Sequence, residues 1–409
     1  MSREHRNPIH VVGTGLDPTA LPLAAARIVA EAEVLVGGDR LLLALPDHPA
    51  GKIPVRAPVS GAVEAADREN RAGKRVVVLA DGDPGFFGIG KQFVLTLGAD
   101  RVLIHPNVSI LQAAAARIKT PWEDIRTVSL HGRKDIWPLR RAMARRQRVG
   151  VYTDAVFTPA RIASDLQACG VEGYRMHVFE DMGTETERVR TFEDLKEAPV
   201  EGFSRLAFVI LEPTHAPVCK LTASMDDDNL LHKDGLITKQ EVRAVGLGLL
   251  GIEPGHVVWD LGAGSGAVAL EASALAFEGM VFAVERDPVR FEIIRSNIRK
   301  TGAYAVEPVQ GEMPGCLDGL PDPDRIFLGG GVRREEVLEA AMSRLLPGGR
   351  VLAHVVLLGS LEHAVGVLRR AGWAPAVTHV QVGRSRPLAE DLRLTALNPV
   401  FAVSAEKPV

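Results

Sequence analysis

The stretch "VVWDLGAGSG", Val257 to Gly266, decides the fold of the second half of this chain. Its apolar residues are typical of a buried parallel strand, and its glycines allow a tight turn into a helix near Ala267. Such a turn brings backbone N–H groups and a helix N-terminus close to a ligand. The sequence therefore predicts an open α/β sheet with a ligand site at its carboxyl edge.

The late position of this stretch predicts more than one domain. The chain has 409 residues, which exceeds the size at which a single hydrophobic core stops growing. Before the stretch, short β-branched runs alternate with helical segments up to "SRLAFVILE", Ser204 to Glu212, as in a separate α/β domain. We expect a first domain over residues 1–212, a linker over 213–235 and a second domain over 236–409.

Composition narrows the function classes. Lys and Arg number 48 against 51 for Asp and Glu, so there is no basic excess and we expect no nucleic-acid partner. The three cysteines lie far apart, which predicts neither a metal site nor disulfides and suits a reducing cytoplasm. The charged N-terminus and the lack of long apolar runs predict a cytoplasmic protein without a membrane anchor.

The residues beside the glycines decide between two cofactors. Gly262, Gly264 and Ala267 also fit the relaxed G-x-G-x-x-A pattern of dinucleotide sites. A carboxylate at Asp260 would repel a pyrophosphate, but it would attract the ammonium group of S-adenosylmethionine (SAM). Glu285 ends the next strand, where an acid can accept ribose hydroxyls. These residues favour SAM.

The D-x-G-x-G-x-G loop followed by an acid one strand later resembles the class I SAM-dependent methyltransferases, which implies a Rossmann-like fold. "LITKQEVRAVGLGLLGIEPG", "PDRIFLGGG" and "GRSRPL" are similar to one subfamily, the decarboxylating precorrin C-15 methyltransferases, from Asp234 to about Val403. The resemblance implies that, besides Asp260, SAM is bound by Thr238, Gly262, Ala263, Gly264, Ser265, Gly266, Glu285 and Met313.

Two glycine loops mark the first half, "HVVGTGLDP" (10–18) and "VVLADGDPGFFGIG" (77–90). Either loop alone is ordinary turn chemistry. Together with "YTDAVFTPARIA" (152–163) they resemble the tetrapyrrole methylase family, whose fold has two α/β lobes with SAM in the cleft between them. The family usually has glycine at Asn107, and asparagine tolerates a positive φ. The implied cofactor residues are Leu16, Gly82, Asp83, Phe86 and Thr158.

Both resemblances together imply one bifunctional enzyme of cobalamin biosynthesis. It would methylate precorrin-6B at C-5 and C-15 and remove carbon dioxide from the C-12 acetate, giving precorrin-8. We expect one SAM site per domain and a homo-oligomer. Glu241 and Arg243 lie next to Thr238, and we expect them to close the C-terminal site as catalytic residues.

Two alternatives stay open on the residues alone. The C-terminal half could be a class I methyltransferase that acts on protein or RNA, which leaves the first half unexplained. The N-terminal half could instead only bind tetrapyrrole and deliver it. The sequence also leaves open which arginines bind substrate carboxylates and which are solvated surface; the candidates are Arg243, Arg333, Arg384 and Arg386.

Overall fold

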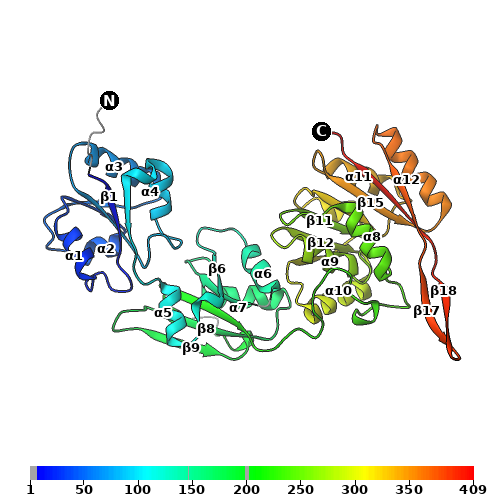
Figure 1. The fold of residues 1–409 in the computed structure, drawn as a ribbon, viewed down its shortest axis with the longest axis horizontal. Coiled ribbons are helices and arrows are strands. Elements are labelled where there is room, and N and C mark those ends of the chain that lie inside the picture. Colours follow the sequence, from blue (N-terminus) through cyan, green and yellow to red (C-terminus); the bar gives the residue numbers. More distant parts are fainter. Residues whose placement is uncertain (1–6, 146, 199–201) are drawn as a thin grey trace.

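The computed structural model describes residues 7–145, 147–198 and 202–409. Three α/β bodies follow one another along the chain, two lobes and a C-terminal domain (Figure 1). Residues 1–6 at the charged N-terminus, Arg146 and residues 199–201 lie outside the described residues. Within the described ranges, no helix is long and apolar enough to cross a membrane.

The first lobe is a parallel five-stranded sheet in the order β3-β2-β4-β1-β5. Its central strands are continuous Val and Leu runs because helices cover both faces. The strands are β1 Ile9–Gly13, β2 Val34–Gly37, β3 Gly51–Pro54, β4 Val76–Ala80 and β5 Val102–His105. The helices are α1 Leu23–Ala30, α2 Asp39–Leu43, α3 Ser60–Arg71 and α4 Gly90–Leu97.

The second lobe is a mixed sheet in the order β6-β7-β10-β8-β9, with β10 antiparallel to both of its neighbours. The first helix of this lobe is α5. A capping box formed by Ser109 and Gln112 determines where this helix begins. The strands are β6 Ile125–Ser129, β7 Arg148–Tyr152, β8 Tyr174–Glu180, β9 Arg188–Phe192 and β10 Ala207–Pro213. The helices are α5 Ile110–Arg117, α6 Trp137–Ala144 and α7 Pro159–Ala168.

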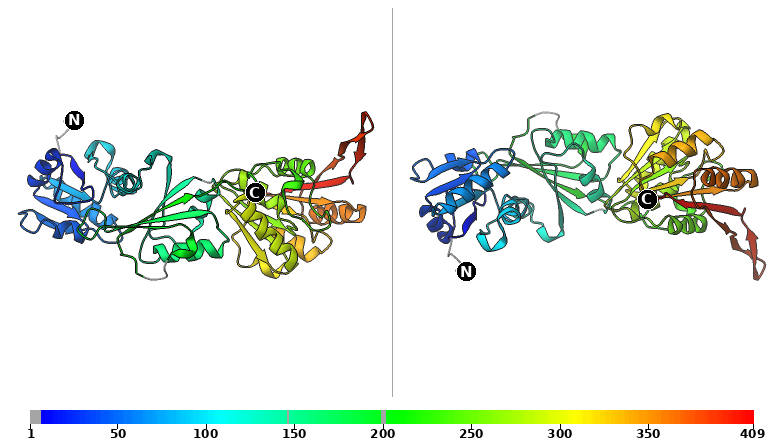
Figure 2. Two further views of the ribbon diagram at one scale, coloured as in Figure 1. Left: turned by 90° about the horizontal axis from the view of Figure 1, so that it is seen from below. Right: turned by 90° about the horizontal axis from the view of Figure 1, so that it is seen from above.

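The C-terminal domain contains a seven-stranded sheet in the order β13-β12-β11-β14-β15-β19-β16, in which β19 alone runs against its neighbours. A two-stranded hairpin, β17–β18, projects from it (Figure 2). The strands are β11 Val257–Leu261, β12 Met280–Glu285, β13 Val306–Gln310, β14 Arg325–Leu328, β15 Arg350–Val355, β16 Ala376–Val380, β17 Gly383–Leu388, β18 Asp391–Ala396 and β19 Val400–Glu406. The helices are α8 Gln240–Leu250, α9 Ala267–Leu275, α10 Pro288–Thr301, α11 Glu335–Arg344 and α12 Leu358–Arg370.

The second lobe packs directly on the C-terminal domain. Arg140 of α6 is buried, and its guanidinium donates to the carbonyl oxygens of Tyr304 (2.8 Å) and Val306 (2.9 Å). The indole of Trp137 meets Phe282 of β12 edge-on, with 5.7 Å between ring centroids. One hydrophobic cluster contains residues of both units, so the junction is a shared core.

Part of the predicted linker, residues 213–235, is bound to the C-terminal domain. The N–H groups of Ser224 and Met225 donate to Glu271 of α9, at 2.9 and 2.8 Å. The N–H of Leu231 donates to Asn297 of α10 at 2.8 Å. Residues 224–231 are thus held by the C-terminal domain, and we propose that this domain begins near Ser224 rather than at residue 236.

Candidate functional site

The glycine loop after β11 allows other groups to come close to its backbone. Gly262, Gly264 and Gly266 have φ values of 75°, 59° and 79°, which glycine adopts without strain. A Cβ on Gly262 would lie 2.8 Å from the backbone nitrogen of Gly330, in the loop after β14, whereas a Cβ on Gly264 would meet nothing within 4 Å. The glycine loop therefore packs against the loop after β14 at Gly262, and it leaves free space beside Gly264.

Glu285 holds this loop at the end of β12. Its side chain is buried, and its two carboxylate oxygens accept the N–H groups of Gly264 (2.9 Å) and Asp287 (3.0 Å). Each carboxylate oxygen can accept a second hydrogen bond. Glu285 can therefore bind a pair of ribose hydroxyls while it keeps the loop in place.

Asp260 lies under the loop on β11 and is almost completely buried. One carboxylate oxygen accepts the N–H of Ala269 in α9 at 3.0 Å, and the other has no partner among the described residues. Burial raises the pKa of Asp260 to about 7. A buried acceptor without a partner, beside an open glycine loop, fits the cationic ammonium group of SAM.

The other predicted cofactor residues of this domain, except Thr238, follow strand ends. Ala263 and Ser265 belong to the glycine loop, and Ser265 is buried while its carbonyl accepts the Asn297 amide at 2.9 Å. Met313 follows β13 and packs near Gly331 of the loop after β14. Thr238 precedes α8 and is half-buried. The structure thus brings the loop, Glu285 and Met313 to one edge of the sheet, with Thr238 where α8 begins.

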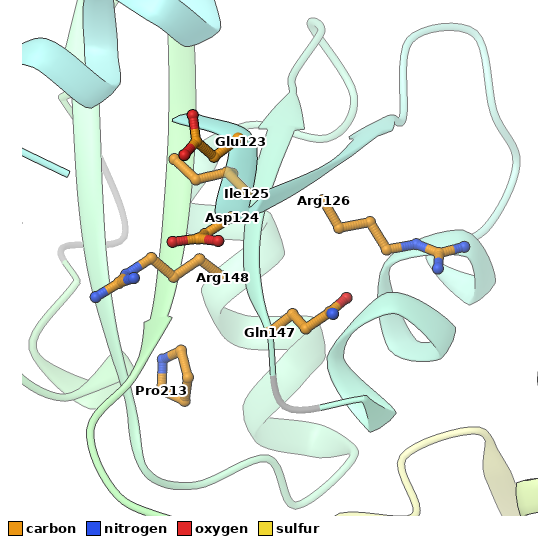
Figure 3. A pocket seen from close by; sticks show the side chains of 7 residues that line it. All are labelled: Glu123, Asp124, Ile125, Arg126, Gln147, Arg148 and Pro213. Atoms are coloured by element: carbon orange, nitrogen blue, oxygen red, sulfur yellow. The ribbon is translucent and has the colours of Figure 1, made fainter. Parts of the chain in front are cut away.

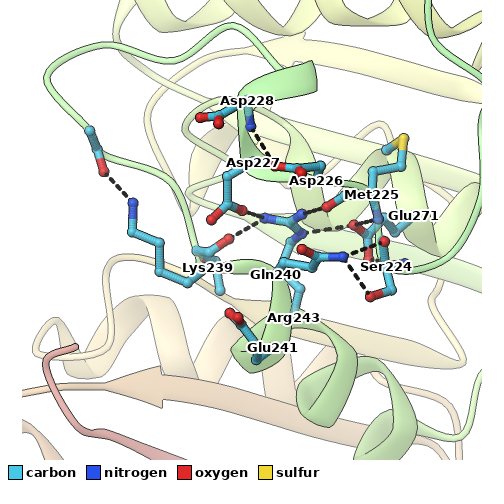
Figure 4. Close-up of polar contacts among 12 residues, drawn as sticks. Ser224, Met225, Asp226, Asp227, Asp228, Lys239, Gln240, Glu241, Arg243 and Glu271 are labelled. Atoms are coloured by element: carbon cyan, nitrogen blue, oxygen red, sulfur yellow. Dashed lines mark hydrogen bonds and ion pairs between the residues drawn. The ribbon is translucent and has the colours of Figure 1, made fainter. Parts of the chain in front are cut away.

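The expected catalytic role of Arg243 does not fit its surroundings in the structure (Figure 4). Its side chain has no exposed surface, and its guanidinium pairs with Glu271 at 2.9 Å and Asp227 at 2.7 Å. It also donates to the carbonyls of Met225 and Thr238. Two carboxylates neutralise this cation away from solvent, so we propose that Arg243 holds residues 225–238 on α8 rather than binding a substrate.

Glu241 lies nearer to solvent than Arg243. Arg384 of β17 donates to both of its carboxylate oxygens, at 2.9 and 2.7 Å. The hydrogen bonds from Arg384 hold the pKa of Glu241 below its usual value. Glu241 is therefore ionised and paired near neutral pH, which suits positioning better than donation of a proton.

The first half forms a pocket of about 510 Å³ between its two lobes. The loops after β1 and β4 meet there, because Gly15 and Gly82 exchange two backbone hydrogen bonds of 3.2 and 3.0 Å. Three predicted cofactor residues line this pocket: Leu16, Gly82 and Phe86. Other lining residues in the second lobe were not predicted, among them Tyr152, which ends β7, and Asp181 and Met182, which follow β8.

Two predicted cofactor residues of this half do not line the pocket. The Asp83 carboxylate accepts the N–H groups of Gly85 (2.8 Å) and Asn107 (3.2 Å). Thr158 is the N-cap of α7 and accepts the Arg161 N–H at 3.3 Å. The Asp83 side chain therefore stabilises two loops, and the Thr158 side chain stabilises the start of α7. Asn107 does not adopt a positive φ; its amide donates to the Gly13 carbonyl at 2.9 Å and closes the β1 loop.

A second pocket, of about 520 Å³, lies on the second lobe and contains none of the predicted site residues (Figure 3). One of its two arginines, Arg148, pairs with Glu212 at 2.7 Å. Two acids also line it, so it does not favour an anionic substrate. The lining residues are Glu123, Asp124, Ile125, Arg126, Gln147, Arg148 and Pro213.

Comparison with known proteins finds one family match in each half of the chain. Residues 8–198 match the family model of tetrapyrrole (corrin/porphyrin) methylases, and residues 229–407 match a precorrin methyltransferase domain. Fold and sites therefore define a two-domain methyltransferase. A precorrin-6Y C(5,15)-methyltransferase [decarboxylating] from Sinorhizobium sp. is 32% identical over 413 residues, which cover 96% of this chain and 94% of the relative. The chain belongs to the family of precorrin-6Y C(5,15)-methyltransferases (decarboxylating).

Shorter relatives match part of the chain. A probable cobalt-precorrin-6B C(15)-methyltransferase (decarboxylating) from Saccharolobus solfataricus is 31% identical over 188 residues, 44% of this chain and 94% of that relative. A solved structure of a precorrin-6y C5,15-methyltransferase from Geobacter metallireducens GS-15 is 41% identical, with a TM-score of 0.44. It covers 45% of this chain and 97% of that one.

Proposed function

We propose that this chain is a bifunctional enzyme of cobalamin biosynthesis. It methylates precorrin-6B at C-5 and C-15 and decarboxylates the C-12 acetate, giving precorrin-8. One observation carries the proposal: two glycine-loop sites on unlike folds lie in one chain, which covers 94% of a relative named for both methylations and the decarboxylation. A class I methyltransferase acting on protein or RNA would leave the pocket between the first two lobes without a use.

We assign C-5 methylation to the two lobes and decarboxylation with C-15 methylation to the C-terminal domain. The family model over residues 229–407 supports this assignment. So does the short archaeal relative, which is named for the decarboxylating C-15 reaction alone. A first half that only delivers tetrapyrrole is less well supported, because its pocket is lined by the predicted cofactor residues Leu16, Gly82 and Phe86.

Each domain is proposed to hold one SAM. Bound SAM supplies an electrophilic methyl group, so the protein chiefly has to align the reacting carbon with it. In the C-terminal domain, Glu285 would hold the ribose and Asp260 the ammonium group, while Glu241 and Thr238 lie where α8 begins. Decarboxylation benefits from moving the acetate out of water. The apolar side chains of Val356 and Leu357 after β15, and of Leu358 at the start of α12, would help to exclude water there.

The affinity of the C-terminal site for SAM is expected to rise with pH. Only ionised Asp260 attracts an ammonium group, and its pKa is about 7. Between pH 5.5 and 7, below the α-amino pKa of about 8, the ionised fraction of Asp260 and the affinity should rise about tenfold. Calorimetric titration at several pH values measures this. Asp260→Asn should bind weakly at every pH, and a flat wild-type profile would contradict the assignment.

We also propose that copies of the chain associate through the β17–β18 hairpin. A two-stranded hairpin is marginally stable by itself, and Leu392 and Leu394 on one of its faces are 66% and 74% exposed. A second copy would cover them. The Leu392→Ser, Leu394→Ser double variant should have a lower molar mass by light scattering than the wild type. Leu43→Ser, at a residue 75% exposed in the first lobe, is the control, and unchanged mass in the double variant would exclude this interface.

The function is tested by incubating the full-length chain with SAM and precorrin-6B and weighing the products. The expected product has gained two methyl groups and lost one carbon dioxide. A substrate that keeps its mass would refute the assignment.

A further inference from the structure

The second face of the β17–β18 hairpin carries an unusual pair of charges. Arg386 lies directly opposite Arg393 in the ladder, and both are exposed. Directly opposed residues share a face, and like charges there destabilise a ribbon. Neither guanidinium has an ion pair in the described part of the chain. Asp391, on the same face, accepts the N–H of Leu392 instead.

This face is directed toward the start of α8, which the predicted cofactor residue Thr238 precedes. Arg384 lies two residues before Arg386 and therefore on the same face of the strand. Its guanidinium reaches Glu241 (2.7 Å) at the start of α8 and Asp227 (2.8 Å) in the segment before that helix. The hairpin follows β16, which runs parallel to β15, so it leaves the sheet at the carboxyl edge, where the glycine loop also lies. The Arg386–Arg393 pair thus extends the rim of the site.

Most of the other arginines at this edge are neutralised, but Arg333, in the loop after β14, is exposed and has no ion pair among the described residues. Arg243 is buried between Glu271 and Asp227, and Arg384 pairs with Glu241 and Asp227. Arg334, in the loop after β14, pairs with Glu312 and Glu336. Arg386 and Arg393 therefore differ from the single Arg333 in being two directly opposed cations whose charge the described residues leave uncompensated.

We propose that Arg386 and Arg393 bind carboxylates of the tetrapyrrole substrate at the C-terminal site. This inference rests on the proposed function. Guanidinium groups bind carboxylates through paired hydrogen bonds, and a substrate with many carboxylates would relieve the repulsion between the two arginines. The same pair would attract the anionic substrate to the rim before it reaches the glycine loop.

The test compares Arg386→Gln, Arg393→Gln and the double variant with Arg369→Gln. Arg369 lies in the last turn of α12, at the opposite edge of the sheet, so its variant removes one charge far from the site. KM for precorrin-6B in the release of carbon dioxide should rise about fivefold in each single variant and further in the double variant. The dissociation constant for SAM should stay at the wild-type value, and the salt dependence of KM should weaken.

A KM in the double variant equal to that of Arg369→Gln would overturn the inference. So would a double variant whose molar mass by light scattering differs from that of the wild type, because the pair would then belong to an interface between copies. A wild-type chain without activity on precorrin-6B would instead refute the proposed function, so the two failures are distinguishable.

Discussion

Replacing Arg243 with Met is expected to lower the free energy of unfolding of the C-terminal domain by about 3–5 kcal/mol. The substitution keeps much of the side-chain volume, but it leaves the carboxylate of Glu271, which has no exposed surface, without its counter-ion. Asp227 loses one of its two arginines as well. Denaturant unfolding followed by circular dichroism measures the loss.

Arg384→Met is the matched control, because it removes the other arginine from Asp227. Its side chain is 36% exposed, and ion pairs with access to water contribute about 1 kcal/mol or less. Adding Glu271→Gln to Arg243→Met should restore part of the stability by removing the uncompensated charge. Equal losses for Arg243→Met and Arg384→Met would show that the buried cluster is not the anchor of residues 225–238.

Gly262→Ala is expected to remove one of two SAM sites per chain and to slow the release of carbon dioxide at least about 100-fold. Gly262 has a φ of 75°, and its new Cβ would lie 2.8 Å from the nitrogen of Gly330. Both the strain and the clash move the loop that carries Gly264 and its bond to Glu285. Calorimetric titration with SAM should give two sites for the wild type and one for the variant.

Gly255→Ala is the control for this experiment. Gly255 belongs to the same domain, and a Cβ there would meet nothing within 4 Å, so both sites should remain. Two full-strength SAM sites in Gly262→Ala would contradict the location of the C-terminal site. The melting temperature of each variant shows whether the domain has stayed folded.

Much of the fold follows from local patterns. The alternation of apolar strands and helices after residue 236 predicts β11 to β15 and α8 to α10, because parallel strands buried on both faces are continuous apolar runs. The glycines after β11, together with Glu285, predicted the loop and the acid that holds it. These features need only local sequence, since a strand end and the turn that follows it lie within a few residues.

What escaped prediction depends on pairing between distant segments. Arg243 looked available for a substrate because its partner Glu271 lies 28 residues further on. Asp83 and Thr158 belong to motifs of the family, yet their side chains cap loops and a helix. The exposed hairpin was not predicted either, since its register, which places Arg386 opposite Arg393, is set by a turn in a largely polar segment.

The most direct test of the central claim is the mass of the product that the full-length chain makes from precorrin-6B and SAM with a deuterated methyl group. The account predicts one product that carries two labelled methyl groups and has lost one carbon dioxide. A product with a single label, or one that retains the carbon dioxide, would contradict the claim that this chain joins two methyl transfers and a decarboxylation.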